Sequence, residues 1–529
     1  MRQRVDAWIE GDPDADTRDH LRAATDDELQ EWFADTLAFG TAGLRGPLRA
    51  GPNGMNTAVV VRTTAAIVSW LRERCLGGGT VVVGRDARHG SEKFATATAE
   101  VFAAAGFEVV LLPRPLPTPI VAFAVRHLGA VAGVQITASH NPAPDNGYKV
   151  YLSGGAQLIP PADREIEAAI AGVGPAATVP RTPVTPADDG LIDKYLERVR
   201  SLPIRVDRSV RIALTAMHGV GGATCVAALH AAGFDDVHVV TSQFEPDPDF
   251  PTAPFPNPEE PGTTDALLSL AANVEADIAI ALDPDADRCA VGVPGPRGWR
   301  MLTGDETGAL LADHLLSSAP PNSLVANTIV SSQLMSALAL ARGARYARTL
   351  TGFKWLVRAG DGLVYAYEEA IGHCVDPTFV RDKDGISAAV VVADLTAALR
   401  TRGTTLLDAL DDLAVEFGVH AAAQVSKRVD DLADIAAVMT RVRADPPATL
   451  AGRAVTTVDH LAVRGPLRTD AVELVGDGIR VIVRPSGTEP KLKAYLEAIV
   501  PVARRATLPD DRAEAEAILG ELGTFARGL

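Results

Sequence analysis

Short apolar runs alternate with helical patterns along the first 425 residues of the chain. The runs at 80–83, 107–112 and 133–136 have the length and composition of buried strands, and an alanine-rich helical pattern covers about 92–105. This alternation predicts mixed or parallel sheets covered by helices. We therefore expect an α/β fold.

The same rhythm restarts twice and changes near the end of the chain. It restarts at 212–215, with further runs at 235–240 and 276–282, and again at 324–329 after Pro320-Pro321. The last hundred residues predict short strands and two helices, at 454–458, 461–463, 478–483, 431–441 and 511–522. We expect three similar α/β domains with mixed sheets and a smaller C-terminal α+β domain, over 1–205, 206–318, 319–425 and 426–529.

Composition narrows the class of protein. An apolar content of 47% with 22% charged residues over 529 residues is ordinary for a soluble globular chain, and no apolar run is long enough to span a membrane. The N-terminus lacks the apolar segment of a secretory signal, and the four cysteines show neither metal-ligand nor disulfide spacing, so we expect a reduced, cytoplasmic protein. The formal charge of −17 argues against nucleic acid or an anionic membrane as partner, and leaves small anionic substrates open.

The segment 136–149 carries a candidate nucleophile. It reads Ile-Thr-Ala-Ser-His-Asn-Pro-Ala-Pro-Asp-Asn-Gly-Tyr-Lys, so Ser139 and His140 follow an apolar run and Asn141-Pro142 starts a turn. A strand that ends this way places one hydroxyl on a loop, where it can meet a substrate, and Lys149 can return a cation to the same place. The alternative is a serine that caps a helix and precedes a polar turn.

The segment Asp283-Pro-Asp285-Ala-Asp287-Arg288 follows an apolar run at 278–282. Three carboxylates at alternate positions repel one another unless a cation lies between them, and oxygen ligands without imidazole favour Mg²⁺. An EF-hand is excluded, because Arg288 and Pro294 occupy the positions of its glycine and its last glutamate. The alternative is a solvated acidic turn.

Two glycine-containing loops carry arginines. In 484–491, Arg484 offers a bidentate fork, Ser486 and Thr488 offer hydroxyls and Gly487 exposes backbone amides, which suits a phosphate, although a generic turn has the same composition. The loop 39–46 has Arg45 but matches neither a P-loop nor a dinucleotide fingerprint. Arg45 can instead face a phosphoryl group at Ser139; the alternative is a helix-terminating turn.

The third predicted domain carries charged segments that suit a carbohydrate. These are Thr351-Gly352-Phe353-Lys354, Tyr367-Glu368-Glu369-Ala370-Ile371-Gly372 and Arg381-Asp382-Lys383-Asp384-Gly385. Carboxylates accept hydrogen bonds from sugar hydroxyls, and a lysine can act as acid/base or phosphate partner. The alternative is a solvated charged surface.

Together these motifs, in this order from about residue 39 to residue 497, resemble the α-D-phosphohexomutase superfamily, the phosphoglucomutase and phosphomannomutase enzymes. The resemblance implies four domains around a central cleft. It also implies a mutase that moves a phosphoryl group between C1 and the terminal hydroxyl of an aldose, through an enzyme phosphoserine and a bisphosphate intermediate. Mg²⁺ as cofactor, glucose 1,6-bisphosphate as activator, a phosphosugar as partner and a monomer or homodimer are expected with it.

The resemblance also implies roles for individual residues. Ser139 is the nucleophile, and its phosphate joins Asp283, Asp285 and Asp287 around the metal. Arg45, His140 and Lys149 surround the phosphoserine, with Arg288 beside the metal loop. Lys383 is a candidate general acid/base. The substrate is held by Glu368 at a sugar hydroxyl, and by Arg288, Glu369, Thr351, Gly352, Lys354, Arg484, Ser486, Gly487 and Thr488.

One position departs from the pattern of hexose enzymes, which usually carry Gly-Glu-Glu-Ser at the sugar loop. Ala370 stands here in place of that serine, and Glu-Glu-Ala-Ile-Gly looks closer to the phosphopentomutase-like branch. A phosphoglucomutase/phosphomannomutase is expected. A phosphopentomutase acting on ribose or deoxyribose 1-phosphate, a hexose-bisphosphate synthase, a phosphatase and a sugar-phosphate-binding protein without activity remain alternatives.

Overall fold

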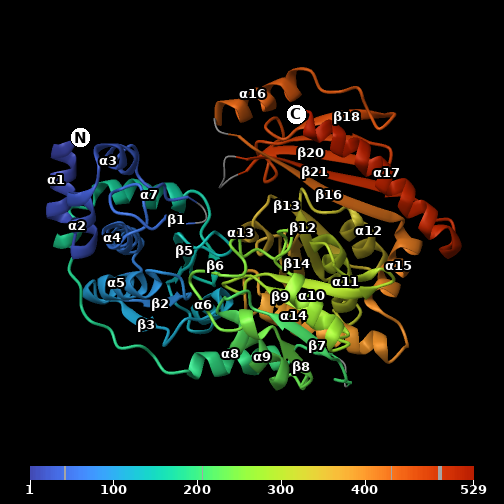
Figure 1. The fold of residues 1–529 in the computed structure, drawn as a ribbon, viewed down its shortest axis with the longest axis horizontal. Helices are drawn as coiled ribbons and strands as arrows, with labels where there is room; N and C mark the ends of the chain where they lie inside the picture. Colours follow the sequence, from blue (N-terminus) through green and yellow to red (C-terminus); the bar gives the residue numbers. More distant parts are fainter. Residues whose placement is uncertain (41–42, 205–206, 430–431, 487–490) are drawn as a thin grey trace. The chain divides into compact units, whose positions relative to one another are not determined.

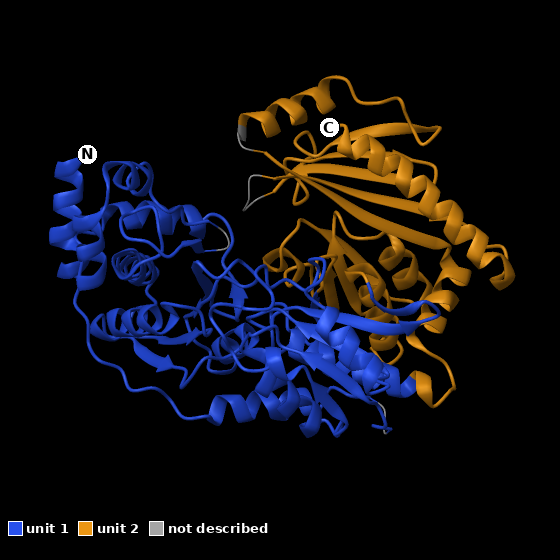
Figure 2. Cartoon of the chain, viewed as in Figure 1, with its two compact units in different colours: residues 1–302, 372–398 blue, residues 303–371, 399–529 orange. Residues whose placement is uncertain are grey.

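The structure is a computed structural model that describes residues 1–40, 43–204, 207–429, 432–486 and 491–529 (Figure 1). The chain forms two compact units (Figure 2). Unit 1 comprises Met1–Leu302 and Gly372–Ala398, and unit 2 comprises Thr303–Ile371 and Leu399–Leu529. Within the described residues, no helix is long and apolar enough to cross a membrane.

The first sheet of unit 1 is mixed. Strands β3, β2 and β4 are parallel, and β5 and β1 extend the sheet antiparallel in the order β1-β5-β4-β2-β3, with β6 paired to β5. Its strands are β1 Leu44–Pro47, β2 Thr80–Arg85, β3 Glu108–Leu111, β4 Ala132–Ile136, β5 Asp145–Leu152 and β6 Ala156–Gln157. The β-branched run Val81–Val83 is fully buried, as expected for a strand covered on both faces.

Three helices precede this sheet in the chain, and others pack against it. Asn56 caps α4 by accepting a hydrogen bond from the Val59 amide at 3.0 Å, and α4 and α5 pack against each other. A capping box between Thr25 and Glu28 starts α3. The helices are α1 Arg2–Gly11, α2 Ala15–Ala23, α3 Asp26–Trp32, α4 Thr57–Glu73, α5 Ser91–Ala104, α6 Thr118–His127, α7 Ala162–Gly172 and α8 Gly190–Arg200, with the 3₁₀ turn η1 Ala176–Thr178.

The second sheet of unit 1 has the order β11-β10-β9-β7-β8. Strands β8, β7 and β9 are parallel, and β10 and β11 complete it antiparallel. Its elements are β7 Ile212–Thr215, β8 Val237–Val239, β9 Ile278–Leu282, β10 Cys289–Gly295, β11 Gly298–Met301, α9 Gly221–Ala231, α10 Asp265–Asn273 and η2 Thr241–Gln243. The strand β15 Gly372–Cys374 and most of α14 Gly385–Arg400 also belong to unit 1.

Unit 2 begins with a parallel sheet in which β12 lies between β13 and β14. The carboxyl ends of these strands meet at one edge, where ligands bind in open α/β sheets. The elements are α11 Gly304–Leu316, β12 Leu324–Thr328, α12 Leu334–Ala341, β13 Arg345–Thr349, α13 Phe353–Leu356, β14 Leu363–Glu368 and α15 Leu406–Phe417.

The C-terminal part of unit 2 is an antiparallel sheet in the order β16-β21-β20-β19-β18-β17. Its apolar face, with Val481, Val483 and Leu496, forms a core under α16 and α17 (Figure 1). The elements are β16 Val419–Arg428, α16 Leu432–Ala444, β17 Thr449–Leu450, β18 Arg453–Asp459, β19 Val472–Gly476, β20 Ile479–Pro485, β21 Lys491–Val500, η3 Arg505–Thr507 and α17 Leu508–Arg527.

The expected fold class is confirmed: α/β sheets come first and a helix-covered antiparallel sheet ends the chain. The strand predicted at 461–463 is wrong, because this segment is a turn after β18. The Asp459 carboxylate accepts a hydrogen bond from the Leu461 amide at 3.0 Å, and Leu461 is exposed, so the apolar run reflects surface positions and not a strand.

Candidate active site

Ser139 lies in a tight turn directly after β4. Its backbone has a positive φ of 52°, and its amide donates to the Thr137 hydroxyl at 2.9 Å. The turn leads into β5 and no helix follows, so the helix-cap interpretation of Ser139 is wrong. Ser139 is buried, with only 3% of its residue surface exposed. The tight turn therefore restricts the direction of its hydroxyl.

Arg88, which the sequence analysis did not select, supports this turn. Its guanidinium donates to the carbonyl oxygens of Ser139 and Asn141, both at 2.6 Å, and to that of Pro142 at 2.9 Å. Asp86 orients the arginine, because its carboxylate lies 3.3 Å from Nε and accepts the Arg88 amide at 3.0 Å. The available signal was the polar sequence that follows β2, at the same sheet edge as Ser139.

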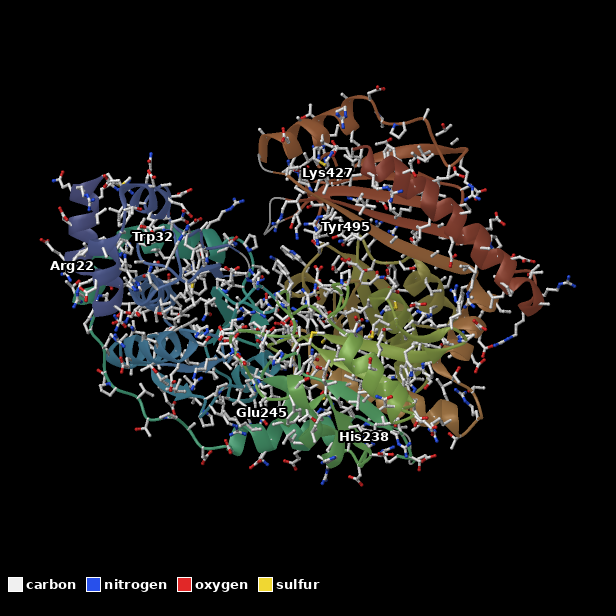
Figure 3. The ribbon with its side chains drawn as sticks, viewed as in Figure 1. Arg22, Trp32, His238, Glu245, Lys427 and Tyr495 are labelled. Atoms are coloured by element: carbon white, nitrogen blue, oxygen red, sulfur yellow. The ribbon has the colours of Figure 1, made fainter. Side chains whose placement is uncertain are left out.

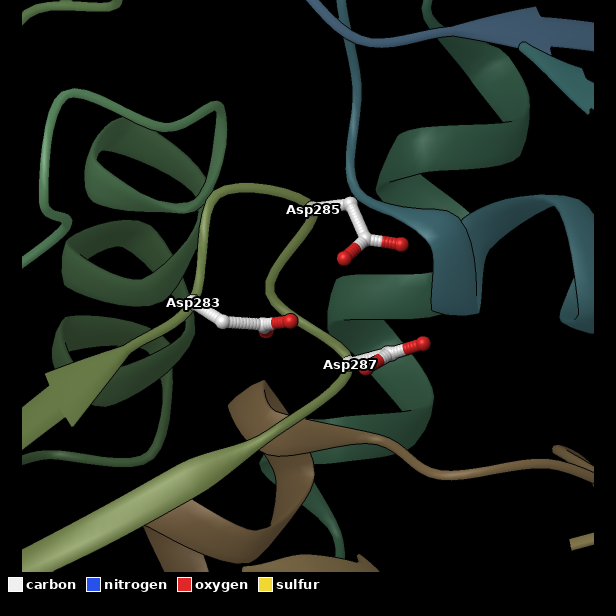
Figure 4. Close-up of side chains that lie close together, drawn as sticks. All are labelled: Asp283, Asp285 and Asp287. Atoms are coloured by element: carbon white, nitrogen blue, oxygen red, sulfur yellow. The ribbon is translucent and has the colours of Figure 1, made fainter. Parts of the chain in front are cut away.

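Asp283, Asp285 and Asp287 project from the short loop between β9 and β10 (Figure 4). Ala286 has a φ of 54°, and its amide donates to the Asp283 carbonyl at 2.8 Å, which makes the loop tight. All three aspartates are fully buried, and each offers an oxygen within 4.8 Å of the others. The solvated acidic turn is therefore excluded.

The turn that carries Ser139 and the aspartate loop contact each other. Ser139 Oγ donates to Asp283 Oδ2 at 2.9 Å and lies 3.3 Å from Nδ1 of His140. Lys149 Nζ donates to Asp285 Oδ2 at 2.6 Å and to Asp287 Oδ2 at 2.8 Å. The structure thus brings Ser139, the aspartate loop and Lys149 into one cluster.

Two other elements complete this cluster. The Asp285 carbonyl accepts the Thr118 amide at 2.9 Å and its carboxylate accepts the Thr118 hydroxyl at 2.5 Å, which docks the aspartate loop on the start of α6. Lys383 Nζ lies 3.1 Å from Asp287 Oδ2. Lys383 is buried, so the interpretation of 381–385 as a solvated surface is wrong.

Arg45, Arg288 and His140 lie around the same cluster. Arg45, on β1, donates to the Asn141 side chain at 3.1 Å, and the Arg288 amide donates to Asp283 Oδ1 at 3.0 Å. Gly43 has a φ of 77°, and a Cβ there would lie 1.8 Å from the Tyr148 carbonyl oxygen, so only glycine allows this approach. The loop leads into a strand and is not a helix end.

Burial and neighbouring charges separate the pKa values of these groups. Burial, followed by the negative charges of Asp285 and Asp287, raises the pKa of Asp283 well above its usual value. Burial acts the same way on Asp285, but the Lys149 ammonium outweighs it and lowers the pKa of that carboxyl. Burial and then the Arg288 and Arg45 charges keep the pKa of His140 well below its usual value, so its imidazole is neutral.

The aspartate loop fits a hard divalent cation. Asp285 Oδ1 and Asp287 Oδ1 are buried and have no hydrogen-bond partner among the described residues. Buried anionic oxygens without a partner are costly unless a cation meets them, and a set of three carboxylates suits Mg²⁺. Asp283, Asp285, Asp287 and Ser139 Oγ are the groups that can hold it.

The remaining predicted residues lie in unit 2. Thr351, Gly352 and Lys354 follow β13, and Glu368 ends β14, so they share the edge formed by the carboxyl ends of these parallel strands. Glu369 comes next, and its carboxylate accepts hydrogen bonds from the hydroxyls of Thr328 at 3.1 Å and Ser331 at 3.0 Å.

The candidate phosphate loop follows β20. Arg484 is the second-last residue of that strand, and the Ser486 amide donates to the Lys491 carbonyl at 2.8 Å, which closes the β20–β21 hairpin. Gly487 and Thr488 lie outside the described residues. The structure therefore brings together Arg45, Ser139, His140, Lys149, Asp283, Asp285, Asp287, Arg288 and Lys383 in unit 1. The candidates Thr351, Gly352, Lys354, Glu368, Glu369, Arg484 and Ser486 belong to unit 2.

Comparison with protein families matches nearly the whole chain. The models for phosphoglucomutase/phosphomannomutase α/β/α domains I, II and III match residues 36–175, 192–295 and 303–417. The model for the C-terminal domain of the same family matches residues 422–515.

Individual proteins with similar sequences or structures carry names of phosphosugar mutases. A probable phosphomannomutase of Haemophilus influenzae is 41% identical over 84% of this chain and 93% of its own length, and a human phosphopentomutase is 35% identical over 79% and 75%. The crystal structure of a putative phosphomannomutase from Thermus thermophilus superposes with a TM-score of 0.74 at 25% identity, covering 93% of this chain and 99% of that one. The chain belongs to the phosphoglucomutase/phosphomannomutase family, and it is a phosphosugar mutase, an isomerase that works by intramolecular phosphoryl transfer.

Proposed function

We propose that this chain is a phosphoglucomutase/phosphomannomutase that moves a phosphoryl group between C1 and C6 of a hexose through a phosphoserine at Ser139. The observation that carries the proposal is the hydrogen bond of 2.9 Å from Ser139 Oγ to Asp283, inside a buried cluster with Lys149 and Lys383. Phosphoryl transfer requires positioning and charge neutralisation more than covalent chemistry, and this cluster offers both.

The reaction follows from the groups in unit 1. The hydroxyl of a bound sugar phosphate attacks the phosphorus on Ser139, the P–Oγ bond breaks, and the product is a sugar bisphosphate. After the bisphosphate turns around, Ser139 Oγ attacks its other phosphate and the isomeric monophosphate leaves. Lys149 and Lys383 are the candidates that remove and return the hydroxyl proton, while Arg45 and the neutral His140 orient the phosphoserine. Mg²⁺, when bound at Asp283, Asp285 and Asp287, neutralises charge on the transferring group.

Unit 2 holds the substrate in this proposal. Glu368 accepts from sugar hydroxyls, with Thr351, Gly352 and Lys354 beside it at the same sheet edge. Arg484, Ser486, Gly487 and Thr488 bind the phosphate that does not react. Glucose 1,6-bisphosphate is the proposed activator, because attack of Ser139 Oγ on one of its phosphates phosphorylates Ser139 and releases a glucose monophosphate. We also propose that the chain divides into four domains, with boundaries after residues 205, 318 and 425.

A second candidate is a phosphopentomutase that acts on ribose or deoxyribose 1-phosphate. It is favoured by Ala370, which lacks the serine hydroxyl that hexose enzymes usually place at the sugar loop, and by the relative named phosphopentomutase. A hydrogen bond of this kind contributes about 1 kcal/mol. Its loss is therefore compatible with either sugar.

The deciding experiment measures kcat/KM with Mg²⁺ for glucose 1-phosphate, mannose 1-phosphate, ribose 1-phosphate and deoxyribose 1-phosphate, with and without catalytic glucose 1,6-bisphosphate. A hexose preference that depends on the bisphosphate is the expected result. A pentose preference would replace the first candidate by the second. Inorganic phosphate release without an isomeric product would indicate a phosphatase, and net bisphosphate formation from another phosphoryl donor would indicate a synthase.

A further inference from the structure

Residues 367–371, the sugar loop of unit 2, lie directly against the first turns of α11. Helix α11 packs against β14, with side chains between them (Figure 3). A Cβ at Gly304 would lie 2.0 Å from the Glu369 carbonyl oxygen, and a Cβ at Gly308 would lie 2.6 Å from the Tyr367 ring. Because residues four apart share one face of a helix, these two glycines allow the loop to approach that face closely.

Asp305, which follows Gly304 in the chain, binds the sugar loop through the Tyr367 phenol. Its Oδ1 accepts a hydrogen bond of 2.7 Å from the Tyr367 hydroxyl. The Asn327 side chain donates to the same phenol oxygen at 3.2 Å, so the phenol donates one hydrogen bond and accepts another. Tyr367 is only 1% exposed and directly precedes Glu368 in β14, so these contacts fix the end of the strand that carries Glu368.

Asp305 Oδ1 also binds the segment 327–333, which ends β12 and leads into α12. It accepts the Ser332 amide at 2.7 Å. Asn327 donates to the Ser332 carbonyl oxygen at 2.9 Å. One carboxylate oxygen and one amide side chain therefore bind both the Ser332 backbone and the Tyr367 phenol, which connects the sugar loop to this segment.

The segment 327–333 also holds the residue that follows Glu368. The hydroxyls of Thr328 and Ser331 donate to the Glu369 carboxylate at 3.1 and 3.0 Å. The neighbours of Glu368 on both sides are therefore held by one connected set of hydrogen bonds.

The segment is itself anchored to the C-terminal sheet of unit 2 by Glu497 on β21. Glu497 Oε1 accepts from the Ser332 hydroxyl at 2.7 Å and from the Gln333 amide at 2.8 Å. Its Oε2 lies 2.9 Å from Arg480 Nη2. Because these contacts do not involve Asp305, the loss of Asp305 alone would loosen the sugar loop and leave the segment in place.

We propose that Asp305 is a positioning residue of the substrate site, which ties Tyr367 to the anchored segment 327–333 and so holds Glu368 where it accepts a hydrogen bond from the sugar. The proposal rests on the sugar-binding role of Glu368 in the proposed function. Asp305 acts through the Tyr367 phenol and needs no contact with the substrate.

The test compares Asp305→Ala and Tyr367→Phe by steady-state kinetics with the preferred phosphosugar. Asp305→Ala should lower kcat/KM about ten- to thirtyfold, because the Tyr367 hydroxyl and the Ser332 amide lose their acceptor and Glu368 is displaced. Tyr367→Phe removes one oxygen atom and keeps the buried ring, so it should lower kcat/KM about fivefold. If Asp305→Ala does not fold, Tyr367→Phe decides.

Asp305→Asn separates the hydrogen bonds from the charge. Burial raises the pKa of Asp305 to about 7, and the charges of Glu369 and Glu497 act in the same direction, so an uncharged side chain is compatible with this place. The amide oxygen of asparagine can accept the same two hydrogen bonds, and kcat/KM should therefore stay within about threefold of the wild type. A loss as large as that of Asp305→Ala would overturn the proposed role of these bonds.

Thr405→Ala is the matched control in the same unit. It removes the hydroxyl that caps α15, which bonds only Asp408 in the described contacts. This variant should lower the melting temperature about as much as Tyr367→Phe and leave kcat/KM unchanged. If Tyr367→Phe loses no more kcat/KM than Thr405→Ala does, Tyr367 and Asp305 stabilise the fold and do not position the sugar loop.

A double-mutant cycle separates the failure of this inference from the failure of the proposed function. Glu368→Ala alone should lower kcat/KM about thirty- to hundredfold, and adding Tyr367→Phe to it should change kcat/KM by less than about twofold, because Tyr367 acts through Glu368. If Glu368→Ala leaves kcat/KM unchanged, the sugar-loop assignment is wrong and the inference falls with it. If Glu368→Ala lowers kcat/KM but Tyr367→Phe is silent, or acts fully in both backgrounds, only the inference is wrong.

Discussion

The Arg88 guanidinium donates to the Ser139 carbonyl oxygen at 2.6 Å, directly beneath the proposed nucleophile. The same group binds the Asn141 and Pro142 carbonyl oxygens, and its side chain is only 1% exposed. The backbone at Ser139 has a positive φ, which makes this turn tight. Arg88 therefore supplies the donors that a sharp turn leaves without partners, and it fixes the direction of the Ser139 hydroxyl.

Arg88→Gln is expected to lower kcat by about a hundredfold with KM changed by less than about threefold, because a nucleophile displaced by a fraction of an ångström reacts slowly while substrate contacts persist. Arg88→Lys should not restore kcat, since an ammonium cannot reproduce the planar fork. Steady-state kinetics measure both.

The control for Arg88 is Arg62→Gln. Arg62 also donates to two carbonyl oxygens in unit 1, those of Ile170 and Val173, both at 3.2 Å, but does so away from Ser139. This variant should lose stability and keep its kcat. If Arg88→Gln behaves like Arg62→Gln, Arg88 stabilises the fold and does not position the nucleophile.

Asp285→Asn is expected to raise the Mg²⁺ concentration for half-maximal activity more than about tenfold and to slow turnover by orders of magnitude, because a buried charge that faces the cation is removed. Mg²⁺ titrations of activity measure this. Asp236→Asn is the control, because that side chain is exposed and its carboxylate bonds only Arg211 and His238 in the described contacts. An unchanged titration in Asp285→Asn would mean that the loop is a turn without a metal.

Glu497 makes the stability of unit 2 sensitive to acid. Burial works to raise its pKa, but hydrogen bonding from His420 and the Arg480 charge outweigh burial and lower the pKa to about 2, from 4.5. A carboxyl whose pKa is lower in the folded state stabilises the fold above about pH 4.5, and this contribution disappears as the pH falls toward 2.

Glu497→Gln should therefore be several kcal/mol less stable than the wild type at pH 7, on the order of 3–5 kcal/mol, because Arg480 loses its partner. The difference should shrink steadily between about pH 4.5 and pH 3. Urea unfolding at several pH values measures it, with the exposed Glu92→Gln as control. A deficit that stays constant across this range would contradict the assigned pKa.

Strands with buried β-branched runs were predictable from the sequence, because their local pattern and their environment agree. The runs at 80–83 and 212–215 are strands, and the polar residues after them gather at the carboxyl ends, as parallel sheets require. The helices α1 to α3 were not predicted, since their apolar positions are sparse: only Val5, Leu21 and Leu29 are fully buried in them. Their stability comes from tertiary packing that includes Phe33 and Ala50.

The supports of the site were harder to predict than its reactive groups. Ser139 and Asp285 carry chemistry that residue type alone suggests. Arg88 and Glu497 act through backbone groups of other segments, and their sequence context resembles that of any strand or loop end. Such contacts depend on the folded arrangement, so local pattern contains little information about them.

The most direct test of the central claim is the phosphorylation of Ser139. The purified protein would be incubated with Mg²⁺ and glucose 1,6-bisphosphate, and its intact mass and phosphopeptides measured, in parallel with Ser139→Ala and with Ser323→Ala as a control for a buried serine of unit 2, whose hydroxyl donates to the Pro320 carbonyl. We predict one phosphoryl group on Ser139 in the wild type and in Ser323→Ala, and none in Ser139→Ala, which should also lose turnover while keeping its melting temperature. Phosphorylation at another residue, or full turnover in Ser139→Ala, would contradict the account.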